Sequence, residues 1–165
     1  FRTLRGSDLD GMLAYINDLI AEDTYIGMYG KPVTRQEEEK VLKETLEKME
    51  NGDHVWIVVE INGRYCGSGE VRRSSMRRQK HVADLGISLA KAYRNEGIGT
   101  ELMNVLLDEA HRMGLTLVTL GCFENNLGAC HLYEKMGFAR AGVIPNAIKW
   151  KDGYVGEVWF YRSLL

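Results

Sequence analysis

The sequence has few cysteines and prolines and no long hydrophobic run. Its 165 residues include two prolines and three cysteines, Cys66, Cys122 and Cys130, with no C-x-x-C pair among them. A small, odd set of cysteines is not a disulfide framework and is typical of a reducing setting. No apolar stretch approaches the roughly 18 residues that a membrane-spanning helix needs. We therefore expect a cytoplasmic protein with no membrane segment.

An excess of basic residues is also missing. Lys and Arg together number 21, Asp and Glu number 23, and the net charge is −2. Proteins dedicated to nucleic acid usually carry a basic excess, so a nucleic-acid partner is not expected. The chain opens at Phe1 with no initiator Met and no signal-peptide layout, and we expect a trimmed start. No histidine has a metal-ligand spacing with another His or Cys, so we predict no metal site.

The length and composition predict one domain over residues 1–165. Hydrophobic residues make up 45% and charged residues 27% of the chain, both ordinary for a globular protein. The periodicity predicts strands at 1–4, 54–61, 64–72, 82–89, 115–123, 138–144 and 154–162. It predicts a helix that begins at Ser7 or Asp8 and further helices over 34–49, 97–113 and 126–136. The fold class is α/β (α+β), with a mixed sheet of six to seven strands flanked by helices around a central β-α-β unit.

Local signals define several boundaries. Thr34 followed by Glu37 is a capping-box pattern at the start of a helix. Asn62-Gly63 is a strong signal for a two-residue hairpin turn. The near-continuous apolar run at 115–123 predicts a strand that is covered on both faces. A turn at 151–153 joins the last two strands.

The most informative stretch is R-N-E-G-I-G-T, from Arg94 to Thr100, between a predicted strand and a predicted helix. Two glycines allow a tight turn, and a helix N-terminus presents free N–H groups, so the loop suits a phosphate or pyrophosphate. A dinucleotide fingerprint needs a further glycine where the chain has Leu102, and a nucleoside-triphosphate loop needs a lysine directly after Gly99. Two interpretations remain: a glycine turn that merely starts a helix, and a short pyrophosphate loop headed by Arg94.

A second motif lies downstream. From Asn126 to Phe138 the chain reads N-L-G-A-C-H-L-Y-E-K-M-G-F, which matches the pattern N-x-x-A-x-x-L-Y-x-K-x-G-F. Together with R-x-x-G-x-G after an apolar strand, it resembles the two signature motifs of the GCN5-related N-acetyltransferases (GNATs). The resemblance covers residues 82–138 directly. The chain departs from the family at Lys91, where many members have a proline.

The resemblance implies a GNAT-like fold that binds acetyl-coenzyme A (acetyl-CoA). In this family the strand before the loop is bulged and splays from the next strand, so that the pantetheine arm can pair with it. The arm then contacts the main chain of Ile87, Ser88 and Leu89, with the Leu89 N–H near the thioester oxygen. The pyrophosphate is then bound by the backbone N–H groups of the loop, and the coenzyme also contacts the start of the next helix. The residues implied are Arg94, Asn95, Glu96, Gly97, Ile98, Gly99 and Thr100 in the loop, and Asn126, Ala129 and Tyr133 on the helix. Asn126 could instead be only an N-cap, and Ile87 and Leu89 are also candidate core side chains.

Acetyl transfer from a thioester to an amine needs an acid for the leaving thiolate and a base for the amine. By motif position Tyr133 is the acid, because a phenol pKa of about 10 lies close to a thiol pKa of about 8.5. The alternative is a packed aromatic side chain. Asp84, on the strand before the loop, and Glu124, at the end of the following strand, are the candidates for the base. The alternative for each carboxylate is a solvated charge at a strand end.

These observations predict an acetyl-CoA-dependent N-acetyltransferase that acts on a primary amine by direct attack through a tetrahedral intermediate. The acceptor class stays open: a small cationic amine or polyamine, a protein N-terminus or a lysine. If some glutamates of the helix predicted at 34–49 face the cleft, they would favour a cationic acceptor; the alternative is an ordinary solvated helix face. The alternative is a non-catalytic acyl-CoA-binding module of the same fold. Acetyl-CoA, as co-substrate, and the amine are the expected partners, and a homodimer is left open.

Overall fold

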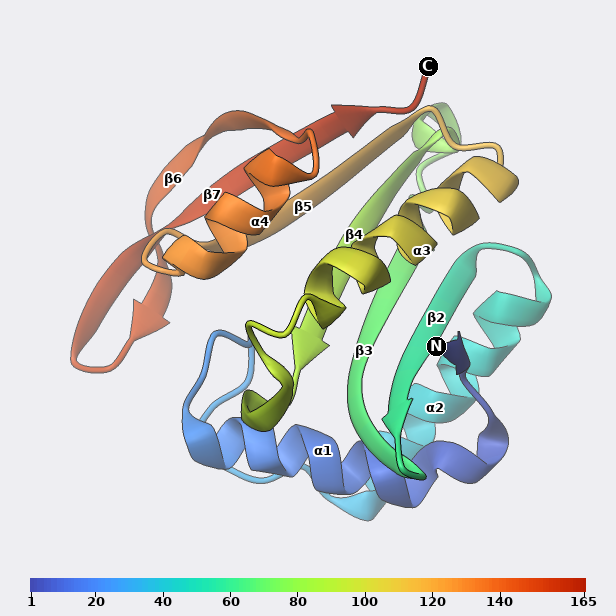
Figure 1. The fold of residues 1–165 in the computed structure, drawn as a ribbon, viewed down its shortest axis with the longest axis vertical. Helices are drawn as coiled ribbons and strands as arrows, with labels where there is room; N and C mark the ends of the chain where they lie inside the picture. The colour runs from blue at the N-terminus through green and yellow to red at the C-terminus, as the bar shows by residue number, and fades with distance from the viewer.

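A mixed sheet of seven strands runs through the molecule (Figure 1). The computed structural model describes residues 1–165. The strands are β1 (Arg2–Thr3), β2 (His54–Ile61), β3 (Arg64–Arg73), β4 (Val82–Leu89), β5 (Leu117–Phe123), β6 (Ala139–Trp150) and β7 (Gly153–Ser163). The helices are α1 (Leu9–Glu22), α2 (Arg35–Glu50), α3 (Ile98–Arg112) and α4 (Leu127–Lys135). The strand order is β1-β2-β3-β4-β5-β7-β6, with β4 and β5 parallel and all other neighbours antiparallel.

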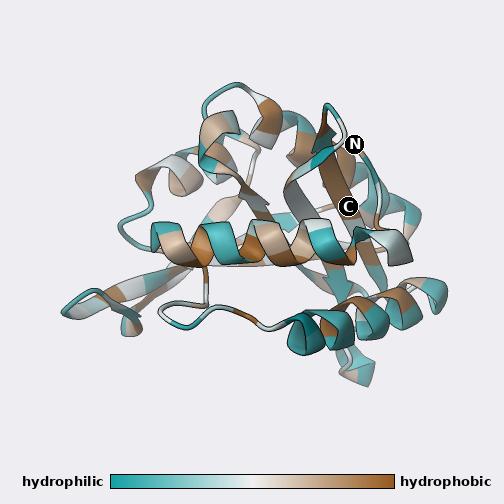
Figure 2. Cartoon of the chain, turned by 90° about the horizontal axis from the view of Figure 1, so that it is seen from below, coloured by the Kyte–Doolittle hydropathy of each residue, from teal (hydrophilic) through white to brown (hydrophobic).

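The helices lie in two layers on opposite faces of the sheet. Seen from below, the sheet lies between α1 and α2 on one side and α3 and α4 on the other (Figure 2). The first side holds a small core around Met12 of α1, Leu42 of α2 and Val58 of β2. The larger core lies on the other side, where Leu102 and Leu106 of α3 pack with buried side chains of β3, β4, β5 and β7. The predicted order of elements and the predicted fold class are confirmed.

Several predicted boundaries are confirmed by their local chemistry. Thr34 and Glu37 form the capping box at the start of α2, with both reciprocal hydrogen bonds present. The first helix begins differently. The Asp8 carboxylate accepts hydrogen bonds from the Arg2 guanidinium and from the Arg5 backbone N–H. The side chain of Asp8 therefore does not cap α1, and a short 3₁₀ turn over Gly6–Asp8 precedes it.

Two strand predictions were wrong in their details. β6 continues to Trp150 instead of ending at residue 144, because register shifts against β7 between Ile144 and Ile148 accommodate Pro145 within the strand. β5 is fully covered on one face only: Val118 and Leu120 are buried, whereas Gly121 is exposed. The helices α1 and α2 lie over the β1–β3 side of the sheet, and this leaves the outer face of β5 open.

The sheet splits at its centre, between β4 and β5. The two strands pair only from Val82 to Asp84 on β4 and from Leu117 to Thr119 on β5. Beyond these residues each strand keeps its outer partner, so the two halves of the sheet diverge (Figure 1). The pairing of β4 with β3 continues to Leu89 without a register shift. The expected splay is present, but the expected bulge in β4 is not.

Candidate active site

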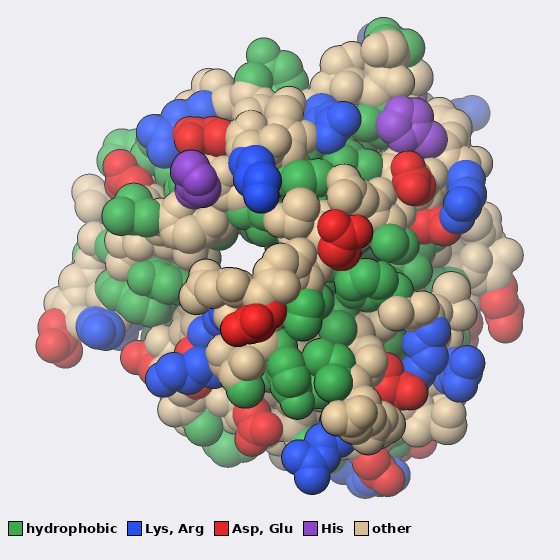
Figure 3. Space-filling view, in the orientation of Figure 1, with side chains coloured by type: hydrophobic (Ala, Val, Ile, Leu, Met, Phe, Trp, Pro, Cys, Tyr) green, Lys and Arg blue, Asp and Glu red, His purple; other side chains and the backbone are tan.

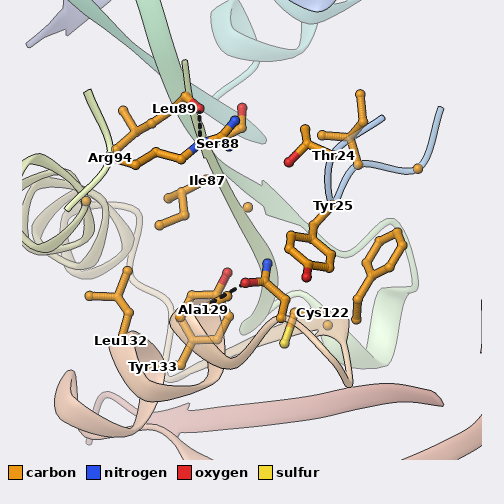
Figure 4. Close-up of a pocket in the computed structure, with 18 of the residues that line it drawn as sticks. Thr24, Tyr25, Ile87, Ser88, Leu89, Arg94, Cys122, Ala129, Leu132 and Tyr133 are labelled. Atoms are coloured by element: carbon orange, nitrogen blue, oxygen red, sulfur yellow. Dashed lines mark hydrogen bonds between the residues drawn. The ribbon is translucent and has the colours of Figure 1, made fainter. Parts of the chain in front are cut away.

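A cavity of about 910 Å³ occupies the split between β4 and β5. Its walls come from the end of β4, the loop before α3, the end of β5, α4, the α1–α2 loop and the hairpin of β6 and β7. In Figure 3 an opening passes right through the molecule at this position. In the close-up, Tyr25 of the α1–α2 loop lies across the cavity from Arg94 and Leu132 (Figure 4). Two ligands can therefore approach the same point from opposite sides.

The free edge of β4 presents main-chain groups to the cavity. In an antiparallel ladder every second residue bonds its partner strand, and the residues between point their N–H and C=O groups the other way. The Ala90 N–H donates to the Cys66 carbonyl. The main-chain N–H and C=O groups of the even-numbered residues of β4 therefore point toward β3. Main-chain groups of Leu85, Ile87 and Leu89 consequently face the split, as the prediction for Ile87 and Leu89 requires. The Ser88 hydroxyl accepts a 2.9 Å hydrogen bond from Tyr15 of α1.

The loop before α3 carries a run of unused hydrogen-bond donors. The backbone N–H groups of residues 95–99 donate to no acceptor in the structure, whereas those of Thr100 and Glu101 bond the Gly97 carbonyl. Left-handed conformations at Asn95 (φ 62°) and Gly97 (φ 82°) turn the chain into the helix. Five free donors at the positive end of a 15-residue helix favour an anion.

Arg94 anchors this loop. Its Nε donates to the Leu89 carbonyl at 2.8 Å, and its two terminal nitrogens bond the Glu22 carboxylate at 2.5 and 2.8 Å. The guanidinium therefore joins the end of β4 to the end of α1. Sequence reasoning placed the backbone N–H of Arg94 among the pyrophosphate donors. In the structure this N–H bonds the Lys91 carbonyl at 3.4 Å, and the side chain positions the loop.

The remaining coenzyme candidates divide into two groups. Side chains or main-chain atoms of Asn95, Gly97, Gly99 and Thr100 line the cavity, together with those of Asn126 and Ala129. Glu96 and Ile98 do not line it. The Asn126 side chain accepts the Ala129 N–H at 3.2 Å, so it caps α4 as well as facing the cavity.

Tyr133 lies on α4 with its ring packed against Phe138 and Phe160. The side chain is 6% exposed and lines the cavity, and its hydroxyl has no hydrogen-bond partner in the protein. Burial raises the pKa of Tyr133 above its ordinary value, and the nearby Cys122 and Cys130 add to the shift. The group is therefore a weaker acid than a free phenol. The hydroxyl stays available as a hydrogen-bond donor.

The two predicted bases lie outside the cavity wall. Asp84 pairs with Arg72 at 2.5 Å, and burial raises its pKa while Arg72 opposes the shift and the charges of Glu70 and Glu157 add to it. Glu124 lies at a separate shallow depression, where its carboxylate accepts the Gly156 N–H at 3.2 Å. The structure thus brings neither carboxylate together with Tyr133.

Sequence reasoning missed the contribution of β7 to the cavity wall. Glu157 is the one carboxylate among the residues that line the cavity, and Tyr25 and Phe123 line it nearby. Alternation along β7 indicates which face Glu157 occupies. Only the sheet order, with β7 inserted between β5 and β6, shows that this face meets the split.

No helix of the structure is both long and apolar enough to cross a membrane. No group of three or more His, Cys, Asp and Glu side chains is placed to hold a metal ion. All three cysteines are free and buried, and the sulfur atoms of Cys122 and Cys130 lie 3.6 Å apart.

The strands β4 and β5 diverge, and the loop before α3 presents free N–H donors beside them. This arrangement suits a protein that holds an extended, anionic ligand across its sheet. The model of the Acetyltransferase (GNAT) family matches residues 14–138 of the chain. The protein therefore belongs to this family of acetyltransferases.

Several curated proteins resemble the chain in sequence. The N-acetyltransferase aca1 of Schizosaccharomyces pombe is 33% identical over 88 residues, which are 52% of this chain and 42% of the yeast protein. The L-amino acid N-acetyltransferase AaaT of Escherichia coli is 26% identical over 59% of this chain and 68% of its own length. The chain thus aligns with less than half of the yeast relative.

Solved structures share the whole fold. An acetyltransferase of the GNAT family from Streptococcus pneumoniae superposes with a TM-score of 0.88 at 23% identity, covering 99% of this chain and 98% of that one. The yncA protein of Salmonella typhimurium, solved with its cofactor acetyl-CoA, gives a TM-score of 0.86 at 18% identity, covering 99% and 92%. At these identities the likeness shows the fold.

Proposed function

We propose that the protein transfers the acetyl group of acetyl-CoA to the nitrogen of a primary amine. The observation that carries the proposal is the meeting, at one cavity, of the free edge of β4 with the loop before α3, where Asn95, Gly97 and Gly99 line the cavity and have unused backbone N–H groups. One feature suits an extended amide-bearing arm and the other suits a pyrophosphate. A cavity open on both sides then leaves room for an acceptor (Figure 3).

The chain's own residues divide the binding of the coenzyme between them. The N–H groups of residues 95–99 would hold the pyrophosphate, and Arg94 keeps them in place through Leu89 and Glu22. The main-chain groups of Ile87 and Leu89 would pair with the pantetheine arm like an added strand. On the opposite wall, Asn126 at the start of α4 would border the same arm.

Tyr133 is the proposed partner of the departing sulfur. Its hydroxyl lines the cavity, has no partner in the protein and stays protonated because burial raises its pKa. A donor held in this way stabilises a developing thiolate without reorganisation. The acetyl group supplies the electrophilic carbon, and the amine must lose a proton before its lone pair can attack.

The acceptor class is proposed only as a primary amine. The relatives' names include an L-amino acid N-acetyltransferase of Escherichia coli and a streptothricin acetyltransferase of Streptomyces lavendulae. Because acceptors differ this widely among relatives, only this chain's own residues can indicate its acceptor.

Two measurements on the wild-type protein test the proposal. Calorimetric titration with acetyl-CoA should show saturable binding. Incubation with acetyl-CoA and a panel of primary amines should release free thiol in an amine-dependent manner. Binding without thiol release for any amine would establish a non-catalytic acyl-CoA-binding module instead. Absence of binding would overturn the assignment of the loop and of the free edge of β4.

A further inference from the structure

Glu157 reaches the split from β7. It pairs with Phe123 at the end of β5, and its Oε1 atom lies 3.1 Å from the point that a Cβ of Gly121 would occupy. Because Gly121 has no side chain, the carboxylate can lie over β5 beyond the last residues that pair with β4. It is the one carboxylate that lines the cavity.

Glu157 lacks the basic partner that neighbouring carboxylates have. Arg72 contacts both Asp84, at 2.5 Å, and Glu70, at 3.6 Å. Glu157 instead accepts a 3.1 Å hydrogen bond from the neutral indole N–H of Trp159, and it takes part in no salt bridge. A carboxylate without a cationic partner in the protein is free to pair with a cationic ligand. The indole N–H fixes the position of the carboxylate but leaves its charge unmatched.

Aromatic rings form the wall beside this carboxylate. Tyr25 and Phe123 line the cavity, and their ring centroids lie 5.6 Å apart in an edge-to-face arrangement. Trp150 stacks on Tyr25 at 4.8 Å with an interplanar angle of 6° and braces it from the hairpin. The faces of such rings attract ammonium groups, most strongly where water is partly excluded.

We propose that Glu157, backed by Tyr25 and Phe123, binds the acceptor as its ammonium ion and takes the proton that must leave before the attack. The proposal rests on the proposed function and adds the residue that selects a cationic acceptor. It places the base on β7, across the split from β4, where sequence reasoning had placed it on Asp84 or at Glu124.

The proposed step balances as follows. The ammonium nitrogen gives one proton to the Glu157 carboxylate, which releases it to solvent. The nitrogen lone pair then forms the N–C bond to the acetyl carbonyl carbon, and the C–S bond breaks. The sulfur takes a proton from the Tyr133 hydroxyl, and the second nitrogen proton restores that hydroxyl through water.

A binding experiment tests the charge preference without requiring turnover. Benzylamine, which is cationic at neutral pH, is compared with neutral benzyl alcohol of the same shape, in the presence of coenzyme A. Quenching of tryptophan fluorescence reports binding, since Trp150 and Trp159 both flank the proposed site. We expect wild type to prefer benzylamine by at least about tenfold and Glu157→Gln to lose the preference, as expected for a desolvated charge contact. Equal affinity of wild type for the two probes would overturn the proposal.

A kinetic experiment tests the proton transfer. Glu157→Gln should lower kcat/KM by on the order of 10²-fold near neutral pH and by less at alkaline pH, where more of the amine is already free. Its affinity for acetyl-CoA should stay within about twofold of wild type, because the coenzyme contacts lie on β4, α3 and α4. Asp152→Asn, which removes an exposed carboxylate at the tip of the same hairpin, is the matched control and should match wild type. The same pH-dependent loss in Asp84→Asn or Glu124→Gln, with Glu157→Gln unaffected, would overturn the proposal.

The two experiments separate this inference from the proposed function. Failure of wild type to bind acetyl-CoA, or to release thiol with any amine, counts against the enzyme itself. The benzylamine preference can still be measured in that case and decides whether Glu157 forms a cation site. Normal turnover together with an unchanged Glu157→Gln counts against this inference alone.

Discussion

At the scale of single residues, the ring and the hydroxyl of Tyr133 have different roles: the ring packs, and the hydroxyl is free for chemistry. Its ring packs on Phe138 and Phe160, while its hydroxyl bonds nothing in the protein. Tyr133→Phe should therefore change the free energy of unfolding by less than about 1 kcal/mol. If the hydroxyl stabilises the leaving sulfur, turnover at saturating substrates should fall by on the order of 10²-fold, with the affinity for acetyl-CoA largely kept. An unchanged turnover would mean that Tyr133 has only a packing role.

The direction of the Tyr133 pKa shift gives this prediction a pH dependence. Burial raises the pKa of the phenol, so the hydroxyl stays protonated at least up to about pH 10, the ordinary value. Turnover of wild type should therefore show no alkaline loss from this group below that pH. An alkaline loss below pH 10 that disappears in Tyr133→Phe would contradict the shift. The measurement is the pH dependence of kcat in both proteins.

At the scale of elements, the loop before α3 depends on its backbone conformation. Gly97 has φ 82°, and a Cβ there would meet no atom within 4 Å. Gly97→Ala therefore strains the backbone without a clash, at about 1–2 kcal/mol. Relief of that strain would turn the N–H groups of residues 95–99 away from one another, and we expect the affinity for acetyl-CoA to fall at least about tenfold.

Gly114 provides the matched control for this change. It has φ 71°, also with no atom within 4 Å of a built Cβ, and it lies just after the opposite end of α3. Gly114→Ala should lose comparable stability and keep wild-type affinity for acetyl-CoA in calorimetric titration. Equal loss of affinity in both variants would assign the effect to α3 as a whole rather than to the donor loop.

The helices, strands and loops also show which features the sequence could predict and which it could not. The capping box at Thr34 and the loop at 94–100 depend on neighbouring residues, and the structure has both where the sequence places them. The continuation of β6 past Pro145 depends on pairing with β7, which no local pattern encodes. The cavity-lining position of Glu157 depends on the order β5-β7-β6, a long-range property of the sheet. For the same reason, sequence reasoning could propose carboxylates only on strands next to the loop.

At the scale of the whole molecule, the α1–α2 loop from the first part of the chain meets the β6–β7 hairpin from its last part beside the cavity. The loop after α1 contributes Tyr25 and Tyr29, and the β6–β7 hairpin contributes Lys149 and Trp150. Tyr25 stacks on Trp150, and the Lys149 ammonium lies 5.8 Å from the centre of the Tyr29 ring. The hairpin otherwise projects from the body of the molecule (Figures 1 and 2). These contacts border the proposed acceptor side of the cavity, and the loop before α3 borders the other side.

Trp150→Ala should therefore affect the two ligands differently. An aromatic pair of this kind contributes about 0.5–1.5 kcal/mol, enough to loosen the α1–α2 loop without unfolding the protein. We expect faster hydrogen exchange in residues 24–32 and a several-fold higher KM for the amine, while the affinity for acetyl-CoA stays near that of wild type.

Tyr154→Ala is the control for this prediction, because it removes an exposed aromatic side chain from the same hairpin and Tyr154 does not line the cavity. It should leave hydrogen exchange in the loop and the KM for the amine as in wild type. Equal effects of Trp150→Ala and Tyr154→Ala would mean that the hairpin as a whole, and not its stack on Tyr25, orders the acceptor side. A rise in the Kd for acetyl-CoA that matches the rise in the KM for the amine would show that the two sides of the cavity do not act separately.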